Sequence, residues 1–516
     1  MTHLAVRVRP DTYVDSVILM EASRAMQQAA GVEWAAALMG TPANVDSLVA
    51  EGFDRSKLPD VGANDVVLAA RSASADRCEE AFAAVDSVFA GGVRSQAPST
   101  ESRPRTIEEA TAFLSGANVA VVSVPGQYAA LEAHKALSGG LHVLLFSDNV
   151  PLEDELALKS RGEALGLLVM GPGAGTAMLG GVGLGFANVT RRTPGRGGVG
   201  IAAAAGTGAQ EVMSLLDRWG AGVSHVIGVG GRDVSDAVGG RMMIEAVRAL
   251  EDDPGTDVVV VVSKPPAPRV ARALLDALGN KKRAIAALIG LEDRIATPPG
   301  VSLCSTMEEA VLGALDALGL PRPNLEAGLA VACDRRDQLP EGRRSVRGLF
   351  SGGTLCYEAM TILSSRLGPV YSNTPLKRDW SLPAPPGSHI CLDLGEEEFT
   401  KGRPHPMIDP EPRAERLLEE AKDPAVGVLL IDVVLGYGAH PDPASVLAPA
   451  CAAVASQPYG PRVVAYVLGT EQDPQNYRQQ RERLRQASCM LAPTGAAAAR
   501  MAASMVSSSA VHGWSP

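Results

Sequence analysis

Residues 198–211 read Gly198-Val199-Gly200-Ile201-Ala202-Ala203-Ala204-Ala205-Gly206-Thr207-Gly208-Ala209-Gln210-Glu211. A short apolar run, typical of a buried strand, ends at Gly206-Thr207-Gly208, and apolar residues at helical spacing follow at once. The first turn of a helix presents backbone N–H groups without intrahelical partners and the positive end of the helix dipole. This stretch therefore predicts a site for an anion, most often a phosphate.

The same arrangement occurs a second time, at residues 345–358. A strand pattern, a turn at Gly352-Gly353-Thr354 and a Glu four residues after the Thr all recur there. The segments that follow also recur in order, since 227–231 matches 391–395, 258–263 matches 428–433 and 284–290 matches 463–469. The sequence predicts two copies of one parallel α/β unit, each with a helix start suited to an anion.

Composition and charge exclude several classes of protein. A chain of 516 residues should hold about three or four domains of roughly 100–200 residues. With 47 Lys and Arg against 58 Asp and Glu, and no basic run, nucleic-acid binding is not expected. Seven scattered cysteines without a C-x-x-C spacing predict neither disulfides nor a metal site, and no apolar run is long enough for a membrane span. We expect a cytoplasmic protein.

Strand and helix patterns alternate along the chain, which predicts a multidomain α/β protein with parallel sheets. The predicted parts are an N-terminal α/β module at 1–92, a Rossmann-like domain at 107–195, the two flavodoxin-like repeats at 196–320 and 345–506, and a disordered tail at 507–516. Within 107–195, turns at Pro125-Gly126, Asn149 and Gly171-Pro172 follow strands. Ligands of parallel sheets bind at such carboxyl ends.

These turns, in this order, resemble the α subunit of the succinyl-CoA synthetase superfamily. The matching residues are Val124-Pro125-Gly126, 147–151, Gly171-Pro172, Ala205-Gly206-Thr207 and 228–231, and the second repeat resembles the carboxy-terminal domain of that superfamily's β subunit through 392–395, 436–438 and 469–471. A closer resemblance is to the FdrA family, in which both halves are fused behind a small N-terminal module. Its motifs stand here at 39–44, 146–150, 167–172, 186–189, 228–233, 262–266, 402–410 and 469–474.

The FdrA resemblance implies one subunit of a hetero-oligomeric carbamoyltransferase, which interconverts oxalurate plus phosphate with oxamate plus carbamoyl phosphate. Ligase activity is not expected, because residues 287–298, which correspond to the phosphohistidine segment of the synthetase α subunit, contain no His. The chain also has no room for an ATP-grasp domain. We therefore expect no required cofactor, with CoA a doubtful ligand. Relatives have an Asp-Cys pair where this chain has Gly173-Ala174, so the identity of the carbamoyl acceptor stays open.

Two groups of residues are candidates for the site. The transfer site would use Thr207, Thr354, His405 and Arg403 for catalysis, and Gly206, Gly208, Gly352, Gly353, Gly230, Gly231, Arg232 and Lys264 to bind phosphate and a small carboxylate. From the resemblance, Pro125, Gly126, Asn149, Gly171 and Pro172 would form a coenzyme site.

Each candidate also has a purely structural interpretation. The glycines can be plain turns, Arg232 can form a salt bridge, Lys264 can be a solvated strand end, and the loop around His405, which contains three prolines, can be rigid packing. Glu211 and Glu358 can cap helix dipoles. Two other functions remain open: an acyl-CoA synthetase with CoA-thioester chemistry, and a non-catalytic scaffold that binds an anion and recruits other subunits.

Overall fold

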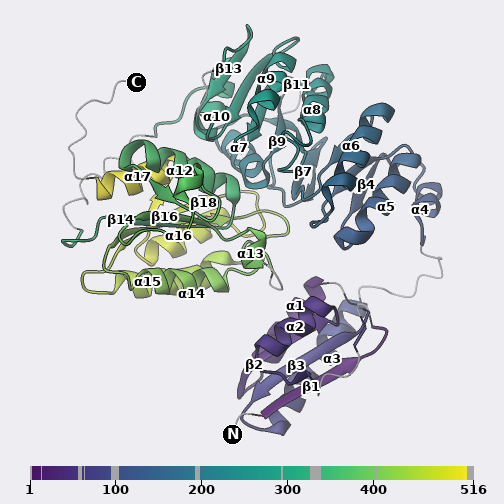
Figure 1. Cartoon of the computed structure of the whole chain (residues 1–516), viewed down its shortest axis with the longest axis vertical. Coiled ribbons are helices and arrows are strands. Elements are labelled where there is room, and N and C mark those ends of the chain that lie inside the picture. The colour runs from purple at the N-terminus through teal and green to yellow at the C-terminus, as the bar shows by residue number, and fades with distance from the viewer. Residues whose placement is uncertain are drawn as a thin grey trace. The chain divides into compact units, whose positions relative to one another are not determined.

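The computed structural model describes residues 3–12, 14, 16–55, 61–62, 64–94, 104–191, 198–291, 295–325, 339–400 and 404–507. The chain divides into two compact units, 1–104 and 105–516, and each is described by itself (Figure 1). Arg403 and almost all of the predicted tail lie outside the described residues.

The N-terminal unit is a three-stranded antiparallel sheet with helices on both faces. Its elements are β1 (His3–Arg9), α1 (Ser16–Gln27), β2 (Val32–Met39), α2 (Pro42–Ala50), β3 (Val66–Ser72) and α3 (Ala75–Arg94), with strand order β1-β3-β2. Helices α1 and α3 pack on one face around Phe82, whereas Leu48 of α2 packs with Phe53 on the other. The alternation predicted for this module is therefore present.

The larger unit begins with a small parallel sheet, β4-β5-β6. It is formed by α4 (Ile107–Phe113), β4 (Val119–Val122), α5 (Gly126–Ser138), β5 (His142–Leu145), α6 (Leu152–Leu165) and β6 (Val169–Met170). The chain then forms the hairpin β7 (Thr176–Leu179) and β8 (Val182–Gly185). The hairpin joins the next sheet, because Met178 pairs antiparallel with Val226. The predicted segment 107–195 thus contributes its last strands to the neighbouring domain.

Two larger sheets follow, and their parallel strands have the same order. The first contains β9 (Gly198–Ala204), β10 (Val223–Gly228), β11 (Thr256–Ser263), β12 (Arg283–Leu288) and β13 (Val301–Cys304), in the order β13-β12-β11-β9-β10 before the hairpin. The second contains β14 (Ser345–Phe350), β15 (Val370–Tyr371), β16 (His389–Asp393), β17 (Val426–Val434), β18 (Arg462–Leu468) and β19 (Met490–Ala492), in the order β15-β16-β14-β17-β18-β19. Apart from the short β15, both sheets have the doubly wound order of flavodoxin-like folds, which confirms the predicted fold class.

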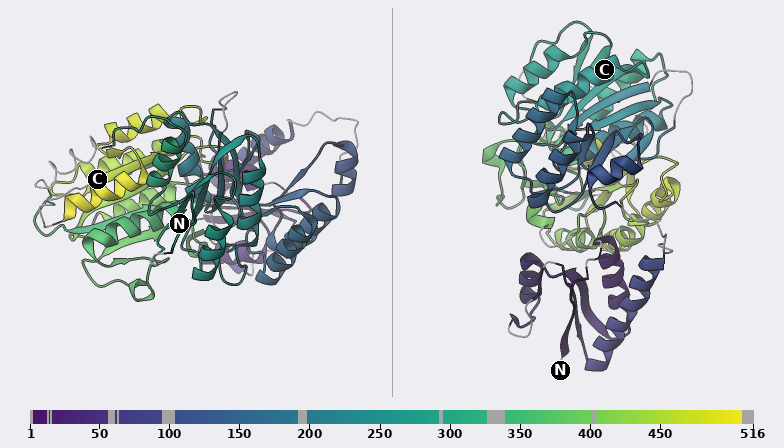
Figure 2. Two further views of the ribbon diagram at one scale, coloured as in Figure 1. Left: turned by 90° about the horizontal axis from the view of Figure 1, so that it is seen from above. Right: turned by 90° about the vertical axis from the view of Figure 1, so that its right-hand side faces the viewer.

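Four helices lie between these two sheets: α7 (Gly206–Arg218), α10 (Met307–Ala317), α12 (Gly353–Leu367) and α17 (Gly495–Val506). Their apolar side chains belong to one hydrophobic core with both sheets. The outer faces are covered by α8 (Arg241–Asp252) and α9 (Pro268–Ala277) on the first sheet, and by α14 (Glu411–Glu420), α15 (Pro443–Ala455) and α16 (Tyr477–Gln486) on the second (Figures 1 and 2). The shared core fixes the two repeats face to face.

Among the helices formed by the described residues, none combines the length and the apolarity that crossing a bilayer requires.

Candidate functional site

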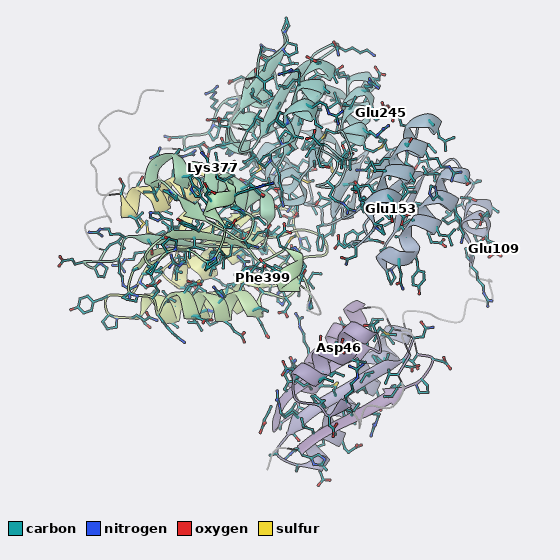
Figure 3. All side chains as sticks on the ribbon, viewed as in Figure 1. Asp46, Glu109, Glu153, Glu245, Lys377 and Phe399 are labelled. Atoms are coloured by element: carbon teal, nitrogen blue, oxygen red, sulfur yellow. The ribbon has the colours of Figure 1, made fainter. Side chains whose placement is uncertain are left out.

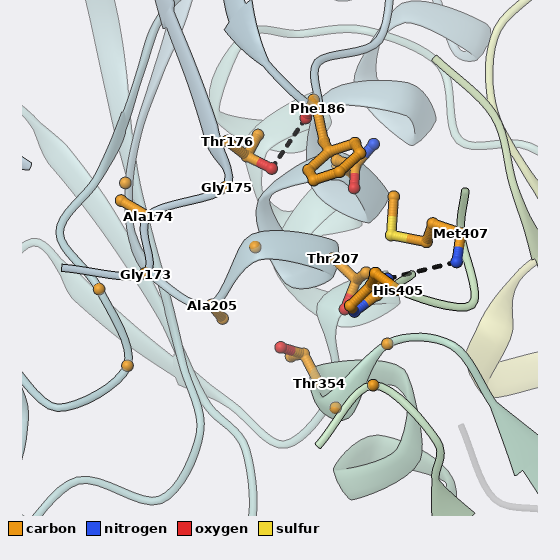
Figure 4. Close-up of a pocket in the computed structure, with 18 of the residues that line it drawn as sticks. Gly173, Ala174, Gly175, Thr176, Phe186, Ala205, Thr207, Thr354, His405 and Met407 are labelled. Atoms are coloured by element: carbon orange, nitrogen blue, oxygen red, sulfur yellow. Dashed lines mark hydrogen bonds between the residues drawn. The ribbon is translucent and has the colours of Figure 1, made fainter. Parts of the chain in front are cut away.

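A cavity of about 400 Å³ lies where the carboxyl ends of both large sheets meet. Helix α7 starts there after β9, and helix α12 starts there after β14 (Figure 4). In each sheet these are the first strands, next to the point at which the strand order reverses, and doubly wound folds bind ligands at that point. The lining includes the predicted Gly206, Thr207, Gly230, Gly231, Lys264, Gly352, Gly353, Thr354 and His405.

The two helix starts touch each other across the repeat boundary. A Cβ on Gly208 would lie 2.7 Å from Cγ2 of Thr354, and a Cβ on Gly352 would overlap the side chain of Thr207. Each glycine therefore makes room for the threonine of the other repeat. The prediction that these helix starts face one common pocket agrees with this geometry.

Neither helix start is capped by a side chain. The N-cap residues, Ala205 for α7 and Gly352 for α12, make no side-chain cap hydrogen bond. No hydrogen bond joins the hydroxyl of Thr207 or Thr354 to another residue in the part of the chain that the structure describes. Two sets of backbone donors and two hydroxyls thus remain at the cavity for an anion.

Charged side chains from both repeats meet beside the start of α12. Lys264, which follows β11, lies 3.2 Å from Glu396 and 3.9 Å from Asp393, and its Nζ lies 5.3 Å from the ring centre of Tyr357. Burial works to lower the pKa of Lys264, but the nearby carboxylates of Asp393 and Glu396 outweigh it and raise that pKa. Lys264 is therefore a cation held at the cavity and not a solvated strand end.

His405 lines the same cavity and is neutral at physiological pH. Burial lowers its pKa to about 4, with Arg413 adding to the fall and Glu396 opposing it. The N–H of Met407 donates to Nδ1 (3.2 Å), which leaves the proton of the neutral ring on Nε2 (Figure 4). The ring of His405, which the sequence analysis named as a catalytic candidate, is thus arranged as a hydrogen-bond donor.

Glu211 and Glu358 link the two repeats in a reciprocal way. Glu211 on α7 accepts from the N–H of Gly495 (3.2 Å), at the start of α17, and from the hydroxyl of Tyr466. Glu358 on α12 accepts from the N–H of Met307 (2.6 Å), at the start of α10. Each carboxyl therefore caps a helix of the other repeat and not its own helix. Burial raises the pKa of Glu211 to about 7 and that of Glu358 well above its ordinary value, in the second case with help from Glu211.

Arg232 does not line the cavity. Its guanidinium donates to the carbonyl of Val150 (2.6 Å) and forms an ion pair with Glu155 (2.8 Å). The neighbouring Asp233 is buried against Lys159 (2.8 Å). The salt-bridge interpretation of this pair is the one that fits, because the side chain is drawn toward α6 and away from the helix starts.

The five predicted coenzyme residues gather beside the cavity without appearing in its lining. A Cβ on Gly126 would collide with the backbone of Asn149, and a Cβ on Gly230 would lie 2.5 Å from the carbonyl of Pro172. A Cβ on Gly171 would likewise collide with the carbonyl of Leu145, at the end of β5. These turns pack on one another, and whether they bind a coenzyme stays a prediction.

Several lining residues were missed by the sequence analysis, among them Phe146, Asp148, Phe186, Gln210, Asp393 and Glu396. Asp393 had a signal in the repeat, which pairs 391–395 with 227–231 and so puts Asp393 at a strand end, and Phe146, Asp148 and Phe186 stand in the family motifs at 146–150 and 186–189. Gln210 lies on α7, and the others come from loops that follow β5, β8 and β16, whose positions depend on contacts across domains.

Three family models match the chain. They are the heavy metal-associated domain of AllF over residues 1–105, the CoA binding domain over 196–288 and the CoA-ligase domain over 349–505. The CoA binding model thus covers the start of α7, and the CoA-ligase model covers the start of α12.

Relatives match the whole chain or its middle. The Escherichia coli (strain K12) protein YahF, itself uncharacterised, is 39% identical over 497 residues, which is 94% of this chain and 95% of YahF. Subunit alpha 2 of the ADP-forming succinate–CoA ligase of Archaeoglobus fulgidus is 33% identical over 29% of this chain and 50% of that subunit. Among solved structures, the apo dinucleotide-forming acetyl-coenzyme A synthetase 1 of Ca. Korarchaeum cryptofilum covers 75% of this chain and 82% of its own, with 17% identity and a TM-score of 0.30.

These matches overturn three expectations. The expected carbamoyltransferase activity is wrong, because the matched models and characterised relatives are CoA ligases and CoA-binding domains. The exclusion of ligase activity and the expectation that CoA is not required are wrong for the same reason. The phosphohistidine and the ATP-grasp domain serve only the ATP-dependent step. Their absence from this chain therefore did not exclude acyl transfer to CoA.

The N-terminal match implies a metal, but the residues do not fit one. The segment between β1 and α1, residues 10–15, has no Cys or His. Among the described residues, no group of three or more His, Cys, Asp or Glu side chains could hold a metal ion. The match therefore reports a shared fold for this module.

The chain is similar to YahF over nearly its full length and matches the CoA binding and CoA-ligase models. Together with the cavity between two uncapped helix starts, these matches place this chain in the succinyl-CoA synthetase-like family.

Proposed function

We propose that this chain is the acyl-transfer part of a CoA ligase, which exchanges an acyl group between phosphate and the thiol of CoA. In one direction, acyl phosphate and CoA give acyl-CoA and inorganic phosphate. The observation that carries the proposal is the pair of uncapped helix starts that meet at one cavity in a chain with CoA binding and CoA-ligase matches.

The helix starts would hold the phosphate. Its oxygens would accept from the free N–H groups of α7 and α12 and from the hydroxyls of Thr207 and Thr354. These donors favour the charge that grows on phosphate as the acyl–oxygen bond breaks. Removing one preorganised donor of this kind typically costs about 3 kcal/mol in the transition state, or about a hundredfold in rate.

Lys264 and His405 would act on the acyl group beside that phosphate. The Nε2–H of the neutral His405 is suited to donate to the acyl carbonyl oxygen. Lys264 adds the positive charge that the phosphate needs in a cavity that also holds Asp393 and Glu396. Both side chains come from loops at the carboxyl ends of strands, so they approach from the same side as the helix starts.

CoA fits as the second substrate. The cavity extends from the helix starts to Phe146, Asp148 and Gly173–Thr176, beside the turns at Pro125-Gly126, Asn149 and Gly171-Pro172. The thiol end would lie in the cavity, and these turns would bind the rest of the coenzyme at the carboxyl ends of β4, β5 and β6.

The ATP-dependent step would belong to a partner subunit. Several characterised relatives are named as single subunits of ADP-forming ligases, including SauD of the Bilophila wadsworthia sulfoacetate-CoA ligase, which is 28% identical over 29% of this chain. Within the family we assign the chain to the FdrA branch, on the motifs at 39–44, 228–233 and 402–410 and on the order of its domains.

The test is the release of thiol from acyl-CoA by the purified chain. Acetyl-CoA, succinyl-CoA and other acyl-CoAs are incubated with phosphate or with arsenate. The mixed anhydride that arsenate forms with the acyl group hydrolyses at once and draws the reaction forward. We expect thiol release that requires the anion, together with heat of CoA binding in calorimetry. No CoA binding and no anion-dependent release with any acyl-CoA, with the ATP-dependent partner absent or present, would refute the proposal.

A further inference from the structure

Asp393 lies at the end of β16 with its carboxyl group against the start of α12. The side chain is buried and lines the cavity. A Cβ on Gly353 would overlap Oδ2 of Asp393 and would lie 2.6 Å from Nζ of Lys264. Because Gly353 has no side chain, the carboxyl group of Asp393 has room to lie at the place where the helix start would hold phosphate.

The position of Asp393 is fixed by a residue from segment 372–388, which connects β15 to β16. The side chain of Asn373 accepts from the N–H of Asp393 (3.0 Å) and donates to its carbonyl (2.9 Å). The carboxyl atom Oδ1 accepts from the N–H of Gly395 (3.1 Å). The carboxyl group of Asp393 also forms a hydrogen bond with the side chain of Glu396, and its Oδ2 lies 3.9 Å from Nζ of Lys264. Since Oδ1 already accepts from Gly395, Oδ2 is the atom placed to carry a proton.

The surroundings of Asp393 hold both signs of charge. Burial raises the pKa of Asp393 to about 7, Lys264 opposes that rise and Glu396 adds to it. The titratable and charged groups that face it are Lys264 after β11, Glu396 on its own loop, Cys356 and Tyr357 on α12, and His405. A phosphate at the helix start would add negative charge beside this carboxyl group and favour its protonated form.

We propose that Asp393 takes up a proton when phosphate binds at the start of α12 and passes a proton between phosphate and the CoA thiol during acyl transfer. Only the second part of this inference, the passage of a proton during acyl transfer, rests on the proposed function. From acyl-CoA, a phosphate oxygen attacks the carbonyl carbon, the carbon–sulfur bond breaks and its electron pair goes to sulfur. The proton of Asp393 goes to that sulfur, and the proton of HPO₄²⁻ then returns to Asp393. The products are acyl phosphate and CoA thiol, and Asp393 is regenerated.

The first experiment is calorimetry of inorganic phosphate binding to the full chain at pH 8, in two buffers with different heats of ionisation. We expect a net proton uptake by the wild type that approaches one proton. The variant Asp393→Asn, which keeps the shape and the backbone contacts to Asn373, should bind phosphate at least as tightly with no proton uptake. Glu398→Gln, an exposed acid on α13 (Glu397–Thr400), is the matched control and should behave as the wild type. No uptake by the wild type, or equal uptake by Asp393→Asn, overturns the inference.

The second experiment compares the rates of phosphate-dependent thiol release. Proton transfer by a positioned side chain contributes at least about a hundredfold to a rate. We therefore expect a loss of about a hundredfold or more in kcat for Asp393→Asn, together with loss of the pH dependence near 7. A variant that keeps the wild-type rate and pH profile overturns the catalytic half. A wild type that couples proton uptake to phosphate, but that neither binds CoA nor cleaves any acyl-CoA with the ATP-dependent partner absent or present, refutes the proposed function and leaves the proton coupling standing.

Discussion

Replacing Glu211 with Gln should make the stability of the larger unit less sensitive to pH. The carboxyl group of Glu211 is buried between the repeats, where it accepts from Tyr466 and from the start of α17. Burial is the main cause that raises its pKa from the ordinary 4.5 to about 7, with Tyr466 and Arg218 opposing. Between these two values the folded chain binds a proton that the unfolded chain has released. The free energy of unfolding therefore falls as pH rises through this window.

The size of the effect follows from the two pKa values. At about 1.4 kcal/mol for each tenfold change in proton affinity, the interval from 4.5 to about 7 corresponds to about 3 kcal/mol. Most of this, about 2 to 3 kcal/mol, is lost between pH 5 and pH 8. Gln mimics the protonated acid and cannot ionise: its oxygen can still accept from the N–H of Gly495, and its NH₂ group can donate to the hydroxyl of Tyr466. The variant should therefore lack this part of the pH dependence and be the more stable protein, relative to wild type, at pH 8.

The assay is urea unfolding at pH 5 and pH 8, followed by tryptophan fluorescence, since Trp219 ends α7 and packs on the shared core. The matched control is Glu153→Gln, an exposed acid on α6 (Figure 3), which should keep the pH dependence of the wild type. If Glu211→Gln and the wild type lose the same free energy between the two pH values, the protonated, buried state of this carboxyl group is refuted.

Two further variants and one NMR titration test the cavity. Thr207→Val combined with Thr354→Val should reduce phosphate-dependent turnover by at least a hundredfold, because both hydroxyls line the cavity where the anion would bind. The unfolding midpoint should stay near the wild-type value, since neither hydroxyl has a partner among the described residues. Unchanged turnover would remove both hydroxyls from the site. Gly352→Ala should abolish phosphate binding in calorimetry, because its Cβ would overlap Thr207. The control Gly116→Ala, where nothing lies within 4 Å of the added Cβ, should bind phosphate as the wild type does. Retained binding in Gly352→Ala would show that the helix starts need not touch. His405, whose pKa falls to about 4, should show no change in its ring NMR signals between pH 5.5 and pH 8, and a midpoint near 6.5 would show that the ring is solvated.

The sequence by itself determined the fold class, and it predicted the two helix starts that line the cavity. Continuous apolar runs such as 426–434 can only be buried on both faces, and their alternation with helical patterns requires parallel sheets. The glycine–threonine turns at 206–208 and 352–354 predicted two helix starts, and the structure shows that neither has a side-chain cap hydrogen bond. Local pattern was enough for these features because each depends on a few neighbouring residues.

The chemistry was the part that sequence reasoning misjudged. The absent phosphohistidine pointed away from CoA, yet the CoA binding and CoA-ligase matches cover both helix starts. A residue that is missing from one step of a multistep reaction says little about the other steps. The twin helix starts are equally compatible with several phosphate-dependent transfers, so they could not identify the acyl carrier.

Tertiary structure alone decided which side chains meet. Lys264 belongs to the first repeat, whereas Asp393 and His405 belong to the second, and only the shared core between the sheets brings all three side chains to one cavity. The same packing turns Arg232 toward Glu155 and lets Glu211 cap a helix of the other repeat. The charge, position and burial of these side chains depend on how the two repeats pack together. That packing results from the sum of many apolar contacts, so no single sequence motif predicts it.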